Sequence, residues 1–112
     1  MKNIFIYGTL RYIPLLETVI GRALGGLDIS QDLLRGHAAM AVAEGPFPMI
    51  IAAANSQADG LLLRGLSADD IERLSYYEAG FEYDLRSVTL ASGVPAEVYF
   101  PREGAWTHNG PW

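Results

Sequence analysis

Glu78 is the side chain of this sequence whose setting best suits acid–base chemistry. Ile71, Leu74 and Glu78 are spaced i, i+3 and i+7, so a helix that buries the first two also turns the glutamate toward the core. An apolar setting raises the pKa of a carboxyl because it desolvates the charged form, and the negative end of the helix adds to this. A raised pKa is what a general base needs near neutral pH. Two alternatives are open: Glu78 frays outward at the helix end, or it is buried against an arginine such as Arg86.

A second candidate lies near the N-terminus, where the apolar run IFIY leads into Gly8, Thr9 and Leu10. A strand that ends there leaves backbone N–H groups unpaired, and a glycine removes the side chain that would keep a ligand away. Together with the Thr9 hydroxyl, such amides can bind a carboxylate or a developing oxyanion. A plain turn from strand to loop is the alternative interpretation.

Composition argues against most other chemistries. The 112 residues include no cysteine, and His37 and His108 form no HExxH-type pair, so we expect no metal and no thiol nucleophile. No GxSxG or GxGxxG motif is present, so the familiar nucleophile and nucleotide signals are absent. The net charge of -5 without a basic cluster argues against a nucleic-acid partner. No apolar run reaches the ~18–20 residues of a membrane span, and the lack of cysteine favours the cytoplasm.

The elements that position these residues are mostly strands. Apolar runs and alternation predict strands at residues 3–7, 34–44, 47–55, 60–66, 82–90 and 95–100. A turn is expected at 56–59, a helix within 12–26 that ends at the Gly25–Gly26 pair, and no regular element in the last dozen residues. Strand runs without strict βα alternation indicate a single α+β domain over residues 1–112 with a mixed, barrel-like sheet. We expect one core that contains Ile4, Ile6, Leu61, Leu63, Ile71, Leu74, Val88 and Val98.

The helix that carries Glu78 has the clearest boundaries in the sequence. Ser67 is a suitable N-cap, and Asp70 stands three residues later as the acidic partner of a capping box. Gly80 is suited to a left-handed residue that stops the helix. These features predict a helix over about 68–78.

With both sites located, the sequence resembles the gamma-glutamylcyclotransferase-like family, in its avirulence-induced-gene-like branch. The matching stretches are IFIYGTLR at the start, FPMI and ADGLLL in the middle, and DIERLSYYEAGFEYDLRSVTL followed by PAEVYF. The match spans about residues 3 to 100, and its specificity comes from the order and spacing of YGTL with Leu74, Glu78, Tyr83 and Tyr99.

The resemblance implies a small mixed β-barrel with flanking helices and a cofactor-free enzyme. Family members that are active cyclise a gamma-glutamyl amine or amino acid to 5-oxoproline and release the amine. Carried over by position, Glu78 is the catalytic acid/base, which takes a proton from the substrate ammonium and passes it to the leaving amine. The substrate-binding residues implied in the same way are Tyr7, Gly8, Thr9, Leu10 and Tyr83.

Two departures from the family pattern leave a second reading open. Ser75 stands where the family often has aspartate, and Ala79 stands where it usually has glycine. We expect the Ala79 Cβ near the pocket mouth, where it disfavours a left-handed conformation. The chain also ends without the closing helix that many relatives have, as expected of a domain cut short. The alternative is a catalytically silent small-molecule-binding or interaction domain of the same fold, for instance the N-terminal part of a larger nucleotide-pyrophosphate hydrolase. The leaving amine and the oligomeric state stay open.

Overall fold

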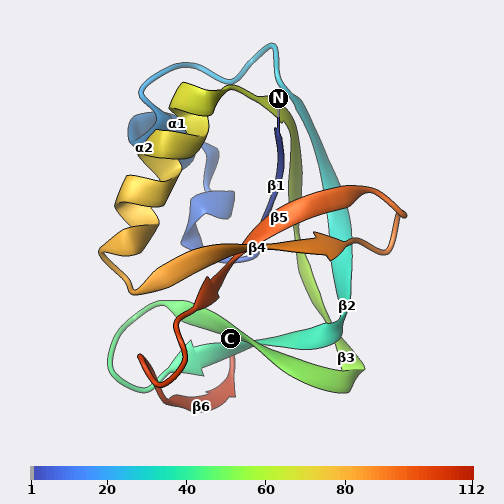
Figure 1. The fold of residues 1–112 in the computed structure, drawn as a ribbon, viewed down its shortest axis with the longest axis vertical. Coiled ribbons are helices and arrows are strands. Elements are labelled where there is room, and N and C mark those ends of the chain that lie inside the picture. The colour runs from blue at the N-terminus through green and yellow to red at the C-terminus, as the bar shows by residue number, and fades with distance from the viewer. Residues whose placement is uncertain (1) are drawn as a thin grey trace.

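The computed structural model describes residues 2–112, which form one curled, mixed sheet with two α-helices on one side (Figure 1). The six strands of this described part are arranged in the order β4-β5-β1-β3-β2-β6. β1 pairs in parallel with β5 and antiparallel with β3, so the sheet is mixed and forms a half-barrel, as the α+β expectation requires. The strands are β1 (Lys2–Ile6), β2 (Asp28–Val42), β3 (Pro48–Leu66), β4 (Tyr83–Thr89), β5 (Pro95–Pro101) and β6 (His108–Pro111). The helices are α1 (Ile13–Ile20), α2 (Ala68–Ala79) and the short 3₁₀ turn η1 (Thr9–Arg11).

Buried side chains form two clusters rather than the one core that the sequence suggested. Alternate residues of a strand point to opposite faces of its sheet. Ile4 and Leu63 therefore lie on the helix side, whereas Phe5 and Leu62 belong to the cluster on the other side. Of the eight expected core residues, Ile4, Ile6, Leu63, Leu74 and Ile71 belong to the helix-side cluster, Val98 and Val88 belong to the other, and half-buried Leu61 belongs to neither.

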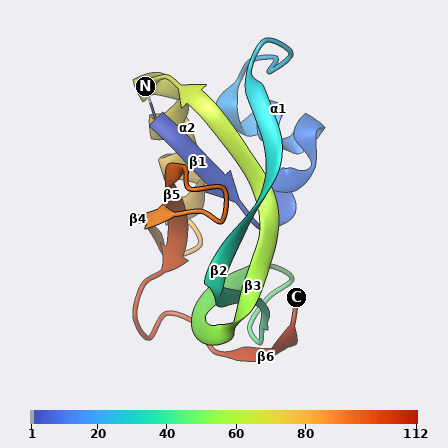
Figure 2. The same ribbon diagram turned by 90° about the vertical axis from the view of Figure 1, so that its right-hand side faces the viewer.

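The long hairpin of β2 and β3 contains the largest difference from the expected elements. No turn interrupts β3 at residues 56–59. Arg35 pairs with Gln57 and His37 with Ala52, so residues 53–56 oppose Gly36 alone in a wide bulge. Gly36 has a φ of 74°, a conformation that glycine adopts easily. Residues 57–59 of the expected turn pair with β2 instead, and Figure 2 shows β3 as a continuous strand that bends sharply near its start and then runs beside β2.

Other strand boundaries also differ from the sequence prediction. β2 begins at Asp28, well before residue 34, because the segment from Asp28 onward continues the ladder with β3. β6 lies at the sheet edge beside β2, where no regular element was expected. Its Pro111 is tolerated because an edge strand does not need every N–H for pairing.

Both helices begin as predicted, and α2 also ends within one residue of its predicted end, whereas α1 ends early. Ser67 and Asp70 form the predicted capping box at the start of α2. Gly80 is right-handed, with a φ of -64°, so the prediction of a left-handed stop there was wrong. Among residues 2–112, Glu82 is the non-glycine residue with positive φ (63°), after a tight turn that continues past α2. α1 ends at Gly21, with a φ of 83°, before the expected Gly25–Gly26 pair. Neither helix in this range is long and apolar enough to cross a membrane.

Candidate active site

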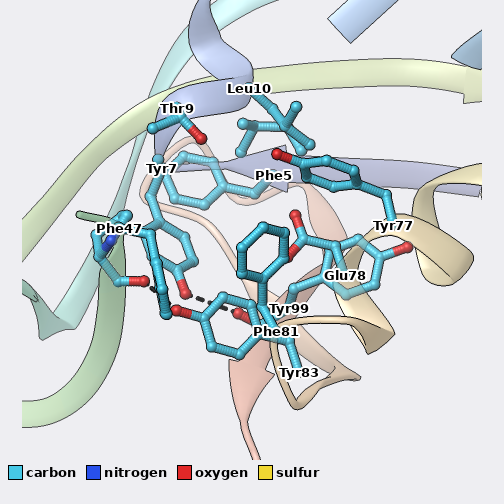
Figure 3. A pocket seen from close by; sticks show the side chains of 13 residues that line it. Phe5, Tyr7, Thr9, Leu10, Phe47, Tyr77, Glu78, Phe81, Tyr83 and Tyr99 are labelled. Carbon is cyan, nitrogen blue, oxygen red and sulfur yellow. Dashed lines mark hydrogen bonds between the residues drawn. The ribbon is translucent and has the colours of Figure 1, made fainter. Parts of the chain in front are cut away.

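A cavity lies between the end of β1 and the C-terminal turn of α2, and the two candidate sites meet there (Figure 3). The chain leaves β1 through Tyr7 and Gly8 into η1, while α2 brings Glu78 to the same space from the other side. The residues predicted from the sequence that line the cavity are Tyr7, Gly8, Thr9, Leu10, Glu78 and Tyr83. The structure therefore brings all six together, although about 70 residues separate the loop from the helix.

Glu78 is half-buried, and its carboxylate points in among the aromatic side chains of the cavity (Figure 3). Burial raises its pKa to about 7, because the ionised form loses hydration. Within residues 2–112 the Glu78 carboxylate forms no salt bridge. Every fully buried polar side-chain atom in this range has a hydrogen-bond partner, so the unpaired Glu78 oxygens are not fully buried and face the open cavity. The Arg86 guanidinium lies over the Phe100 ring instead, 5.2 Å from its centroid. Both alternatives from the sequence were therefore wrong: Glu78 does not fray outward, and it is not paired with Arg86.

Tyrosines surround this carboxylate. Burial raises the pKa of Tyr99 to about 12 and the pKa values of Tyr7, Tyr77 and Tyr83 above their usual range, and the charge of Glu78 adds to each shift. All four hydroxyls are therefore protonated at neutral pH. The site is one carboxyl group, with a pKa near neutrality, in a wall of neutral phenols.

The loop after β1 is held by its own hydrogen bonds and by contact with β3. The N–H of Arg11 donates to the Gly8 carbonyl at 3.1 Å, and the Arg11 Nε donates to the same oxygen at 3.1 Å. Within residues 2–112, the N–H groups of Gly8, Thr9 and Leu10 donate to no other group of the chain. These amides are therefore free to bind a ligand in the adjoining cavity.

Phe47 and Trp106 were not predicted from the sequence. Phe47 lines the cavity and Trp106 packs behind it, and with Phe81 they form the aromatic rim of the site. The Phe47 ring lies 5.1 Å from the Phe81 ring and 5.1 Å from the Trp106 ring, centroid to centroid. The Trp106 Nε1 donates to the Phe81 carbonyl at 2.6 Å. These residues come from three separate loops, so no periodicity in the sequence could have grouped them.

Ala79 does not narrow the cavity, contrary to expectation. Its side chain is exposed and is absent from the cavity lining, which on this helix contains Tyr77 and Glu78. It is the last residue of α2 and has no left-handed conformation, so its Cβ causes no backbone strain. The departure at Ala79 therefore carries no structural penalty at this site.

The fold and the cavity define a cyclotransferase-like domain. The chain belongs to the gamma-glutamyl cyclotransferase, AIG2-like family, whose model matches residues 4–112. No curated protein matches the chain.

Solved structures with the same fold come from several sources. An Arabidopsis thaliana protein studied in solution is 20% identical with a TM-score of 0.82, over 99% of this chain and 76% of that one. An uncharacterized Pyrococcus horikoshii protein is 20% identical with a TM-score of 0.72, over 99% and 84% of the two chains. A protein described as gamma-glutamyl cyclotransferase is 10% identical with a TM-score of 0.77, over 98% and 70%. At these identities the likeness establishes the fold alone.

Proposed function

We propose that this protein is a gamma-glutamylcyclotransferase, which converts a gamma-glutamyl amine or amino acid into 5-oxoproline and a free amine. The observation that carries the proposal is the position of Glu78, a desolvated carboxyl with a pKa of about 7, in one cavity with the loop from Tyr7 to Leu10. Family membership supports the same reaction.

Glu78 is the acid/base of the proposed reaction. In its ionised form it takes a proton from the ammonium group of the substrate, and the freed amine attacks the γ-carbonyl carbon to close a five-membered ring. Glu78 then gives that proton to the leaving nitrogen as the original amide bond breaks. The ring nitrogen loses its second proton to the released amine, which leaves as an ammonium ion. A carboxyl with a pKa near 7 suits both transfers, because either form is accessible at neutral pH. The reaction needs no cofactor.

The loop holds the α-carboxylate of the substrate in this scheme. None of the residues that line the cavity carries a positive charge, so a bound carboxylate depends on neutral donors. The N–H groups of Gly8, Thr9 and Leu10 and the Thr9 hydroxyl are such donors. Tyr83 shapes the wall with its ring, because its hydroxyl already donates to the Pro48 carbonyl.

The competing proposal is a catalytically silent small-molecule-binding or interaction domain with the same fold. For the enzyme, the partner is a small gamma-glutamyl substrate, and we propose that the protein acts in the cytoplasm as one domain.

Release of 5-oxoproline from several gamma-glutamyl amines and amino acids tests the enzymatic proposal. Glu78→Gln keeps the size of the side chain but cannot accept a proton, so we expect the rate to fall by about 10²–10⁴. Glu72→Gln, an exposed change on the same helix, is the matched control and should leave the rate unchanged. Equal turnover by wild type and Glu78→Gln would remove Glu78 as the base. No turnover by wild type on any substrate would favour the silent domain.

A further inference from the structure

Ser75 and Tyr99 form a hydrogen bond at the edge of the cavity that the scheme above does not use. Their hydroxyl oxygens lie 2.9 Å apart, and Tyr99 lines the cavity from β5. Ser75 precedes Glu78 by one turn of α2, which places both side chains on the same side of the helix. Helix α2 therefore contacts Tyr99 through Ser75 and carries the proposed base, Glu78, one turn further along.

The hydroxyl hydrogens of two other tyrosines in the wall are already committed to backbone carbonyls. Tyr7 donates to the carbonyl of Tyr99 at 2.8 Å, and Tyr83 donates to the carbonyl of Pro48. These two phenols cannot donate to a ligand without losing a buried bond. The direction of the Tyr99 hydrogen depends instead on its bond with Ser75, in which either oxygen can be the donor.

The surroundings decide the direction of this bond. A helical serine or threonine often donates to the carbonyl four residues earlier, as Thr18 does to Pro14 at 2.9 Å. Within residues 2–112, the Ser75 hydroxyl has Tyr99 as its hydrogen-bond partner and forms no such backbone bond, so its hydrogen is free for the phenol oxygen. Burial and the charge of Glu78 raise the pKa of Tyr99, so the phenol keeps its own hydrogen. Both effects favour Ser75 as donor and leave the Tyr99 hydrogen for a ligand.

We propose that Ser75 is a positioning residue, which orients the Tyr99 hydroxyl so that it donates a hydrogen bond to the γ-carbonyl oxygen of the substrate. Tyr99 is then a further catalytic residue, because that oxygen gains negative charge as the ring closes and binds a fixed donor more strongly. Tyr99 keeps its proton throughout, so the proton balance at Glu78 is unchanged. The inference rests on the proposed cyclotransferase function.

A double-mutant cycle tests the inference, with kcat and KM for 5-oxoproline release as the readouts. We expect Tyr99→Phe to lower kcat by about 10²-fold, the usual loss for one oxyanion donor. Ser75→Ala should lower kcat by about 10-fold and change KM by less than about 3-fold, because the ground-state carbonyl needs the donor least. The double variant should be no slower than Tyr99→Phe, since Ser75 acts only through Tyr99.

Two further variants separate positioning from a structural effect. Ser75→Thr keeps the hydroxyl and should retain kcat within about 3-fold. Tyr76→Phe, on the same helix with an 86% exposed side chain, should match wild type. Three results would each overturn the inference. The first is a Ser75→Ala variant with wild-type kcat, and the second is a double variant whose loss is the product of the two single losses. The third is a Ser75→Thr variant as slow as Ser75→Ala. If the wild type is active and Ser75→Ala has the same kcat, only this inference is removed. If the wild type shows no turnover, the proposed function and this inference are removed together.

Discussion

The ring of Pro48 lies so close to Gly8 that a β-carbon on Gly8 would come within 2.8 Å of the Pro48 Cγ. The same proline accepts the Tyr83 hydroxyl hydrogen at its carbonyl. Pro48, the first residue of β3, thereby contacts both the loop and the aromatic wall of the cavity. A glycine at position 8 is thus a requirement of packing as well as of ligand access.

Gly8→Ala should therefore destabilise the protein. The added methyl group must displace the proline ring, and overpacking of this kind costs about 1–3 kcal/mol of unfolding free energy. Gly25→Ala is the control, because a Cβ there meets no atom within 4 Å and its φ is not positive. Urea unfolding of both variants checks the expectation, and equal midpoints would contradict it.

The capping box of α2 gives a prediction for acid stability. The hydrogen bond from Arg22 is the main cause that lowers the pKa of Asp70 to about 2, with Arg22 Nη2 2.6 Å from the Asp70 Oδ2. A lowered folded pKa stabilises the protein above the unfolded value of about 4, and this contribution is lost as the pH falls toward 2. Asp70→Asn should lower the unfolding free energy by about 2 kcal/mol at pH 7 and by much less near pH 2.

Asp69→Asn is the matched control for this change. Asp69 stands in the same first turn of α2 but is exposed, whereas Asp70 is buried. Its replacement should alter the unfolding free energy by less than about 0.5 kcal/mol. Equal losses in the two variants at pH 7 would show that general helix electrostatics, rather than the Arg22 pair, stabilise this end.

Local rules accounted for α2 and for Glu78, because both depend on residues close together in the sequence. Ser67 and Asp70 lie within one turn, and the i, i+3, i+7 spacing places Glu78 inward wherever the helix packs. The continuous β3 depends instead on pairing with β2, whose partner residues lie far along the chain. A polar stretch such as 56–59 looks like a turn until that partner is known.

The aromatic rim could not be predicted from the sequence either, because it too depends on contacts between residues far apart in the chain. Phe47, Phe81 and Trp106 meet only after three loops have folded, and each loop is irregular. The right-handed Gly80 was missed because a tight turn carries the chain past the helix end and moves the left-handed residue to Glu82.

Trp106→Phe should weaken this rim. The change leaves the Phe81 carbonyl without its indole donor, and such a loss costs about 1 kcal/mol of unfolding free energy. Trp106 packs on Phe47, which lines the cavity, so a looser rim should change KM more than kcat. Trp112→Phe, at a 45% exposed residue, is the control, and identical KM values in both variants would contradict a role for the rim.

The pH–rate profile reports on the proposed base directly. Because the pKa of Glu78 is raised to about 7 and its ionised form accepts the first proton, kcat/KM should rise with pH and level off above pH 7. Glu72→Gln should keep the midpoint of this rise. A midpoint near 4.5 in the wild type would mean that the essential carboxyl is not desolvated.

Through Glu78, wild-type stability should fall over the pH range in which wild-type activity rises, and Glu78→Gln should remove this dependence. A carboxyl whose folded pKa is raised from 4.5 to about 7 binds its proton more tightly in the folded state, so wild-type stability is highest below pH 4.5 and falls as the pH rises through 7. Glutamine does not titrate, so relative to pH 4 the variant should gain up to about 3 kcal/mol over wild type by pH 8. Urea unfolding at several pH values measures this gain, and the exposed Glu72→Gln variant should show none.

The two readouts together test why Glu78 is present. A Glu78→Gln variant that is inactive and yet more stable than wild type above pH 7 would show that Glu78 serves catalysis at a cost in stability. A gain that does not depend on pH would instead show that the glutamate carries no raised pKa.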